Sequence, residues 1–549
     1  MEEVAPQRGV SMPDIVIENA NIVDGLGNPG FPGGIGITDG RISEIWRAEV
    51  PSFSASSVEI IDAEGQTVCP GFIDIHTHAD WGILDYPAAG SSLLMGVTTE
   101  VGGNCGTSLA PGSSALMEYL RGLGHDSGDA IPRVGDYLHR VEAAKPGNNQ
   151  ALFVGQGAIR AAVMGNRTDF PDPKEMDLMI EILRGAMREG AFGMSTGRAY
   201  VPGCHAGFSE ILALTEELGR HRGLYSCHLA DQWANIHRAV REVLELGIRC
   251  ETPVQISHIK VVGKDNWGRM DEVLAQMEDG LDMGVDVAGD LYPYEYSAVA
   301  QLRDRLPRSL KDKDDAELLD LLGTDAGVDR IRRGWEENPN YATARLPGLG
   351  VVWCALTDHM RGKDLGEIAT GLKTDLAGAV AHLLIENELR VKVAGIMAAE
   401  DLRTALCHPL IAIGSDSTVR DPAEDAEIEP SRSSIHPREY GTFPRVLGRY
   451  VRDEGLLTLE EAVFKMTGLP AERLELSERG SIVRGHRADL MVFDPQVIED
   501  RADLDNPAAP PVGISRVFVG GKLAVSEGEM TGQRNGAALR DLQGRTIYG

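Results

Sequence analysis

Two histidines lie two residues apart at the end of an apolar run, in the segment Pro70-Gly71-Phe72-Ile73-Asp74-Ile75-His76-Thr77-His78. If this run forms a strand, its period of two points both imidazoles to the same side, where they can bind one metal ion. A His-x-His pair also arises by accident at surfaces and in cores, because short motifs produce false positives. The pair therefore raises a hypothesis of metal chemistry that other residues must support.

Five further residues that can bind a metal lie at the ends of other apolar runs: Cys105, His228, His258, Asp290 and Asp416. Taken singly, a histidine at a strand end is more often a hydrogen-bonded core residue, and a buried cysteine more often only packs. Taken together, imidazole and thiolate ligands suit zinc, and an open position on zinc leaves room for an activated water. We therefore favour a metal site.

The middle of the chain alternates apolar runs with longer helical stretches, which is typical of βα units around a parallel sheet. Eight runs can be counted, at 71–76, 97–105, 151–157, 191–197, 224–228, 254–258, 285–292 and 410–416. They predict an α/β protein with a (β/α)8 TIM-like barrel, whose active site lies at the carboxyl ends of the strands. The long stretch before the last run predicts an inserted subdomain around 295–400.

Both ends of the chain contain short strand patterns around tight turns, such as Asp39-Gly40 and Gly520-Gly521. We expect these ends to pair into one small β-sandwich domain. The predicted organisation is a disordered tail at 1–12, the sandwich at 13–68 and 479–549, and the metal-dependent barrel at 69–478.

The chain has 549 residues and a formal net charge of −30, which argues against a nucleic acid or an anionic membrane as partner. Its seven cysteines are odd in number and scattered, which indicates a reducing compartment and not a disulfide scaffold. No apolar stretch approaches about 18 residues, and the N-terminus lacks a signal-peptide pattern. We expect a cytoplasmic enzyme with a small-molecule substrate, and an oligomer is compatible with this sequence.

The chain resembles the amidohydrolase superfamily, and within it the D-aminoacylase (N-acyl-D-amino-acid deacylase) family, over nearly its whole length. The motif that ends in His76-Thr77-His78 is typical of the whole superfamily. Two motifs are more specific to the deacylases, Gly103-Asn104-Cys105-Gly106 and His436-Pro437-Arg438-Glu439-Tyr440-Gly441-Thr442-Phe443-Pro444-Arg445. Shorter matches are Gly96-Val97-Thr98-Thr99, Ser257-His258-Ile259-Lys260-Val261, Tyr292-Pro293-Tyr294 and Gly414-Ser415-Asp416.

The resemblance implies that Cys105, His228 and His258 hold one tightly bound zinc ion. It also implies that His76, His78 and Asp416 border a second, weaker metal position. The neighbouring hydantoinases and dihydroorotases bridge two metals with a carboxylated lysine on the fourth strand, but the fourth run here contains no lysine. The thiolate of Cys105 is the plausible replacement, and this favours a deacylase.

The resemblance also suggests a mechanism in which zinc activates a water and Asp416 acts as general base and then as general acid. Tyr200 would stabilise the oxyanion. A substrate with a free carboxylate requires cationic or hydroxyl donors, because these bind carboxylate oxygens. The candidates that match the family are Lys260, Tyr292, Ser297 and Arg438.

The leading hypothesis is therefore zinc-dependent hydrolysis of an N-acyl-D-amino acid to a carboxylate and a D-amino acid. Alternatives are a hydrolase of cyclic amides or of bulky aromatic amides, and a non-catalytic scaffold. The scaffold predicts lost ligands, and none of the six expected ligands is lost. After His228 the family usually has an Arg followed by Asp-Glu, whereas this chain has Ala230, Asp231 and Gln232, followed by Trp233. This change predicts a wider or more apolar pocket.

Overall fold

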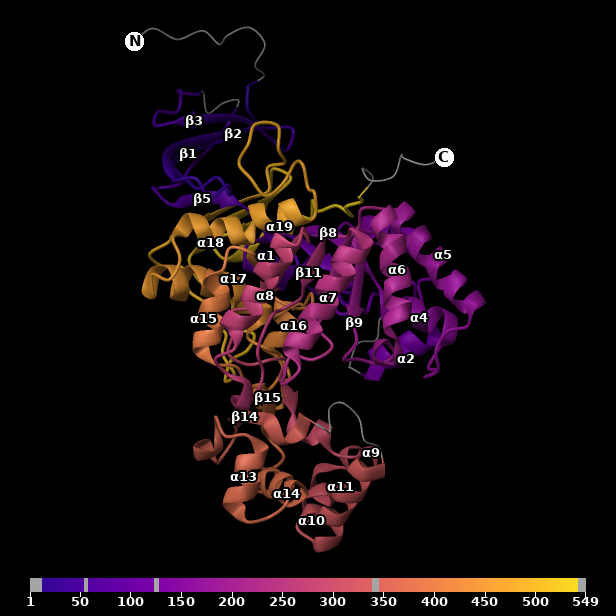
Figure 1. Ribbon diagram of the computed structural model, residues 1–549. Helices are drawn as coiled ribbons and strands as arrows, with labels where there is room; N and C mark the ends of the chain where they lie inside the picture. The colour runs from indigo at the N-terminus through magenta and orange to yellow at the C-terminus, as the bar shows by residue number, and fades with distance from the viewer. Residues whose placement is uncertain (1–11, 54–57, 123–127, 338–344, 542–549) are drawn as a thin grey trace.

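A computed structural model describes residues 12–53, 58–122, 128–337 and 345–541. Figure 1 shows three parts, with a β-sheet domain at one end, a barrel in the middle and a mainly helical lobe at the opposite end. The predicted tail at 1–12 lies outside the described residues, except for Met12. The barrel carries the predicted site residues, so its geometry is the part of the fold that matters for function.

Eight parallel strands form the barrel, in the sheet order β16-β12-β11-β10-β9-β8-β7-β6. Each strand overlaps one predicted run, and every residue in the eight strands is buried, as expected when a parallel sheet is covered on both faces. A parallel bridge between Thr77 and Ser417 joins the ends of β6 and β16. The predicted TIM-like barrel is thus confirmed. The strands are β6 (Phe72–Asp74), β7 (Val97–Gly102), β8 (Asn149–Gly155), β9 (Gly193–Gly197), β10 (Leu224–His228), β11 (Val254–Ile256), β12 (Val287–Leu291) and β16 (Ile411–Ile413).

Amphipathic helices surround the barrel, and α5 (Pro173–Glu189) illustrates why they form. Asp172 and Glu175 make a reciprocal capping box at its start, and Gly190 with φ 123° ends it. Its buried residues lie on one helical face, so that face packs into the hydrophobic core of the barrel domain. The other helices of the barrel are α1 (Gly90–Leu94), α2 (Ser114–Gly122), α3 (Val134–Ala144), α4 (Gln156–Met164), α6 (Phe208–Arg220), α7 (Ile236–Cys250), α8 (Met270–Asp282), α15 (Ala399–Cys407), α16 (Pro422–Ala426), α17 (Arg438–Arg445), α18 (Leu459–Met466) and α19 (Gly468–Arg473).

Strands from both chain ends form one nine-stranded sheet, in the order β20-β19-β18-β17-β5-β1-β2-β3 with β4 beside β1. The two ends join where β5 runs antiparallel to β17 and Cys69 lies opposite Met491. Asp39 and Gly40 both have positive φ in the tight turn between β2 and β3, as the Asp-Gly pair predicts. The strands are β1 (Ile15–Ile22), β2 (Phe31–Thr38), β3 (Arg41–Arg47), β4 (Glu59–Asp62), β5 (Thr67–Pro70), β17 (Leu490–Phe493), β18 (Ile514–Val519), β19 (Lys522–Ser526) and β20 (Glu529–Met530).

The lobe at the far end of the molecule comes from the chain between β12 and β16 (Figure 1). It has a three-stranded antiparallel sheet and a hydrophobic cluster of its own, which is distinct from that of the barrel. In the described part of the chain no single helix could cross a membrane; α13 and α14 pass the length and composition test only as a pair bent by 93°. The lobe contains β13 (Ala300–Gln301), β14 (Leu349–Cys354), β15 (Val391–Gly395), α9 (Arg308–Lys311), α10 (Asp315–Leu322), α11 (Asp325–Glu337), α13 (Leu365–Leu372) and α14 (Leu376–Glu386).

Candidate metal centre

The six predicted metal ligands meet at the carboxyl ends of the barrel strands. Their donor atoms form two groups, and within each group all atoms lie within 4.8 Å of one another. One group contains Cys105, His228 and His258, and the other contains His76, His78, Cys105 and Asp416. The sulfur of Cys105 belongs to both groups, so it lies between two neighbouring positions that could each hold a metal ion.

The first group has the donor chemistry and nearly the spacing of a tetrahedral zinc site. The Sγ atom of Cys105 lies 3.6 Å from Nδ1 of His228 and 3.3 Å from Nε2 of His258, and the two nitrogens are 2.8 Å apart. Ideal Zn–S and Zn–N bonds at tetrahedral angles place sulfur about 3.5 Å from nitrogen and the nitrogens about 3.3 Å apart. The three side chains therefore fit zinc, with a fourth position open.

The second group mixes imidazole and carboxylate donors. Nε2 of His76 lies 3.4 Å from the Cys105 sulfur and 3.6 Å from Oδ1 of Asp416. Nε2 of His78 lies 3.2 Å from the same carboxylate oxygen. These donors suit a divalent cation beside the first position.

The surroundings of the two histidines in the first group favour the neutral imidazole. Burial, followed by the charge of Lys260, lowers the pKa of His228 to about 3. The same two causes hold the pKa of His258 well below its usual range. Burial raises the pKa of the Cys105 thiol well above its usual range, and the charge of Asp416 adds to the rise. A metal that binds the Cys105 thiolate must therefore displace a proton, whereas both histidines present free lone pairs.

Three of the six residues have left-handed backbone conformations, with φ of 53° at Cys105, 34° at His258 and 55° at Asp416. This conformation costs a residue other than glycine about 1–2 kcal/mol, so the surroundings must impose it. Asn104 helps to do so for Cys105, because its amide donates to the carbonyl oxygens of Val101 and Ile75 and accepts from Ser226. The sequence pattern does not reveal this strain.

Asp290 lies behind the ligands and outside both groups, although it was a candidate ligand. Its Oδ1 atom is 2.9 Å from Nδ1 of His76 and accepts the backbone N–H of His258 at 2.7 Å. A carboxylate on Nδ1 directs Nε2 toward a metal, so Asp290 orients a ligand. The strand β9 contains no lysine, and its Ser195 accepts the backbone N–H of Gly106.

Asp416 lies between the metal ligands and a buried arginine. Its Oδ2 atom is 2.8 Å from Nη1 of Arg438. Burial acts to raise the pKa of Asp416, but the charge of Arg438 and a hydrogen bond from His78 outweigh it and hold this pKa well below its usual range. The carboxylate is therefore ionised and able to accept a proton.

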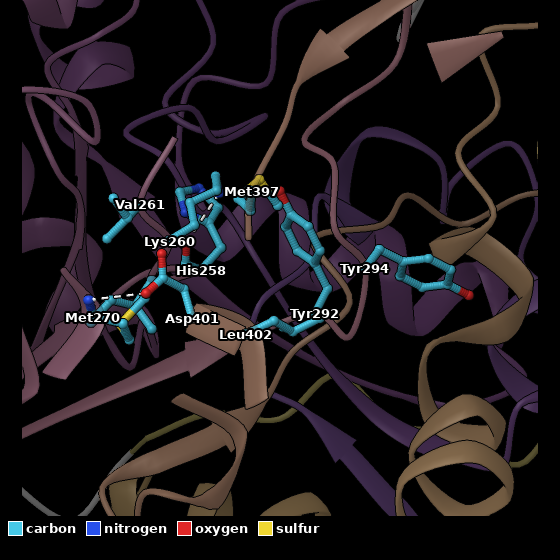
Figure 2. A pocket seen from close by; sticks show the side chains of 10 residues that line it. His258, Lys260, Val261, Met270, Tyr292, Tyr294, Met397, Asp401 and Leu402 are labelled. Carbon is cyan, nitrogen blue, oxygen red and sulfur yellow. Dashed lines mark hydrogen bonds between the residues drawn. The ribbon is translucent and has the colours of Figure 1, made fainter. Parts of the chain in front are cut away.

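Three of the four predicted carboxylate-binding residues lie close together. The charged groups of Lys260 and Arg438 lie 4.8 Å and 4.9 Å from the centroid of the Tyr292 ring. Figure 2 shows Lys260, His258 and Tyr292 around a small cavity of about 10 Å³. Burial lowers the pKa of Lys260 to about 8. The hydroxyl of Ser297 accepts the backbone N–H of Gly395 in the inserted lobe.

Two residues near His228 complete the site. The hydroxyl of Tyr200, which is partly exposed, lies 3.4 Å from Nδ1 of His228, so it reaches the open side of the first group. The Gln232 side chain lies 3.1 Å from Nδ1 of His258, a contact that sequence reasoning missed. The departure from the family pattern after His228 is the sequence feature that could have drawn attention to Gln232.

The family model for the amidohydrolase family matches residues 59–321 and 394–525 of the chain. A D-aminoacylase from Alcaligenes xylosoxydans xylosoxydans is 32% identical over 528 residues, which cover 96% of this chain and 97% of that protein. A solved D-aminoacylase with a binuclear metal centre has a TM-score of 0.74 at 33% identity and covers 96% of this chain and 100% of its own.

A solved N-acyl-D-glutamate deacylase from Bordetella bronchiseptica has a TM-score of 0.73 at 30% identity and covers 97% of this chain and 100% of its own. That structure contains zinc and a phosphonate inhibitor that mimics the tetrahedral intermediate of the reaction. The two solved structures that share this architecture are therefore a D-aminoacylase with a binuclear metal centre and an N-acyl-D-glutamate deacylase with bound zinc.

Proposed function

Because this chain belongs to the amidohydrolase family, and within it to the D-aminoacylase group, we propose that it removes the acyl group from N-acyl-D-amino acids. The products are a carboxylate and a D-amino acid. The observation that carries this proposal is the pair of ligand groups that share Cys105 at the carboxyl ends of the barrel strands. The absence of lysine from β9 supports linear amides over the cyclic amides of hydantoinases.

Cys105, His228 and His258 would hold one tightly bound zinc ion, and His76, His78 and Asp416 would border a second, weaker position. The sulfur and nitrogen donors of the first group support this assignment, since soft thiolate selects zinc over calcium or magnesium. When bound, zinc supplies a Lewis acid for the amide carbonyl and lowers the pKa of a water.

Asp416 is suited to move the proton in this reaction. Its ionised carboxylate accepts the proton as water attacks, and it then delivers that proton to the leaving nitrogen, because an amine leaves more easily when protonated. The hydroxyl of Tyr200 donates toward the oxyanion from the open side of the first group.

Lys260, Tyr292 and Arg438 form the part of the site that would bind the substrate carboxylate. Lys260 and Arg438 are buried cations close to the buried Tyr292 ring, and a buried cation binds a carboxylate strongly because little water competes. Arg438 also contacts Asp416, so carboxylate binding and the proton-transfer group share one residue.

The test is to incubate the zinc-loaded protein with N-acetyl D- and L-amino acids, hydantoins and aromatic amides, and to detect the released amine. We expect release from D-amino acid derivatives that stops after chelation and returns with added zinc. Release only from hydantoins or aromatic amides would refute the substrate, and full release after complete metal removal would refute the mechanism.

A further inference from the structure

Gln232 lies in the loop between β10 and α7 and is only 5% exposed. Its amide nitrogen is 3.1 Å from Nδ1 of His258 and 3.4 Å from the carbonyl oxygen of the same residue. The backbone carbonyl of Gln232 also accepts the N–H of Val262, four residues after His258. Side chain and backbone thus both attach this loop to the segment that carries a candidate ligand.

The loop is held from its other side as well. Asp231 accepts the backbone N–H of Trp233 at 2.6 Å and pairs with Arg345, which precedes β14 of the inserted lobe, at 2.6 Å. The guanidinium of Arg345 also lies 5.2 Å from the centre of the Trp233 ring. Gln232 is therefore placed against His258 by its neighbours and not by its own rotamer preference alone.

The hydrogen bond at Nδ1 decides which nitrogen of His258 can bind a metal. Nε2 faces the Cys105 sulfur and the His228 ring, so Nε2 is the ligand atom. A neutral imidazole has one proton, which must lie on Nδ1 when Nε2 binds a metal, and this proton needs an acceptor. The amide nitrogen of Gln232 can only donate, but its amide also carries an acceptor oxygen. A half-turn of the amide group places that oxygen opposite Nδ1, in exchange for the donation to the carbonyl oxygen of His258.

We propose that Gln232 is a positioning residue that sets the zinc affinity of the first ligand group, by accepting the Nδ1 proton of His258. The proposal rests on the proposed function only in taking His258 as a zinc ligand. A neutral amide accepts more weakly than a carboxylate and can also donate, so Gln232 stabilises the metal-binding tautomer only in part. Zinc affinity should therefore change in opposite directions when this side chain loses its acceptor and when it becomes a stronger one.

The chain contains a matched control for this experiment. Oε1 of Gln276 on α8 lies 2.9 Å from Nδ1 of His237 on α7, and His237 belongs to neither ligand group. Gln276→Leu therefore removes the same kind of Gln–His hydrogen bond without touching the metal centre. Any loss of zinc affinity that is common to Gln232→Leu and Gln276→Leu would be a general effect on folding.

The experiment measures the zinc affinity of the full-length protein by competition with a chromophoric chelator. We expect Gln232→Leu to bind zinc about 10- to 100-fold more weakly than the unmodified chain. We expect Gln232→Glu to bind at least as tightly as the unmodified chain, because a carboxylate only accepts and favours the Nδ1–H tautomer. Gln276→Leu should bind zinc like the unmodified chain.

Zinc affinity of Gln232→Leu within twofold of the unmodified chain would overturn the proposal. Weaker binding by folded Gln232→Glu would overturn it too, and this variant decides the question if the leucine variant does not fold. The measurement needs no substrate. A protein that behaves as expected here but hydrolyses nothing in the substrate panel would refute the proposed function and leave the role of Gln232 intact.

Discussion

Gly197, the last residue of β9, separates two candidate zinc ligands, and replacing it with alanine should weaken zinc binding. A Cβ atom at this position would lie 1.9 Å from the carbonyl oxygen of Cys105 and 2.6 Å from its carbonyl carbon. Gly197 is also paired in register with His228 on β10. The added methyl group would therefore push the Cys105 backbone away from the strands that carry Gly197 and His228.

The size of the effect follows from the overlap. Favourable non-bonded contacts begin at about 3.5 Å, so the Cys105 backbone must move by about 1.6 Å. Metal–ligand distances vary by only about 0.2 Å, so a backbone shift of this size distorts the geometry of the zinc ligands. Overpacking of this kind costs about 1–3 kcal/mol, and 1.4 kcal/mol corresponds to a factor of ten. We expect Gly197→Ala to lower zinc affinity by about 10- to 100-fold.

The assay is chelator competition on Gly197→Ala, with thermal unfolding in excess chelator to measure the effect on the fold separately. Gly185→Ala is the control, because a Cβ at Gly185 on α5 meets no atom within 4 Å. This control should be slightly more stable than the unmodified chain, since alanine favours a helix over glycine. Normal zinc affinity in folded Gly197→Ala would show that this contact does not set the ligand geometry.

Two further predictions concern the proton acceptor and the stability of the barrel. Asp416→Asn should lower kcat by about 10²- to 10⁴-fold, because an amide cannot accept the proton. Zinc analysis of this variant should still find the tightly bound ion. Wild-type turnover with zinc bound would show that another residue is the base. Lys465 is buried on α18, donates to the carbonyl of Ile411, and has its pKa lowered by burial to about 8. The unfolded chain keeps this proton up to a pH of about 10.4, so stability should rise with pH between these values. Urea unfolding should show the unmodified chain gaining about 2.5 kcal/mol relative to Lys465→Met from pH 7 to pH 10, and a constant difference would contradict this.

Much of the fold could be predicted because local patterns match it. Apolar runs of strand length between helical stretches predict parallel strands, and each of the eight predicted runs overlaps a barrel strand. The Asp39-Gly40 pair predicted a tight turn that both positive φ values support. These features depend on residues that are neighbours in the chain, so they can be predicted from the sequence.

The orientation of the ligands could not be predicted in the same way. Asp290 has a residue type and a strand-end position that suit a metal ligand, yet it lies behind His76 and orients it. Gln232 stands out in the sequence only as part of the departure from the family pattern after His228, and that departure does not say that its side chain contacts Nδ1 of His258. The hydroxyl of Ser297 accepts the backbone N–H of Gly395 in the inserted lobe, a contact that its sequence motif does not indicate. In each case the decisive contact joins segments that are distant in the chain.

Residue chemistry and strand periodicity are local properties, so the amino-acid sequence alone indicates which residues can bind a metal and that they follow strands of a barrel. Which ligands share an ion depends on how distant segments of the chain fold together. Closure of the barrel brings His76 next to Asp416, which lies 340 positions further along the chain, and it places the Cys105 sulfur in both ligand groups. His76-Thr77-His78 is the first metal-binding motif in the sequence, but in the folded chain it forms only one side of a centre built around Cys105.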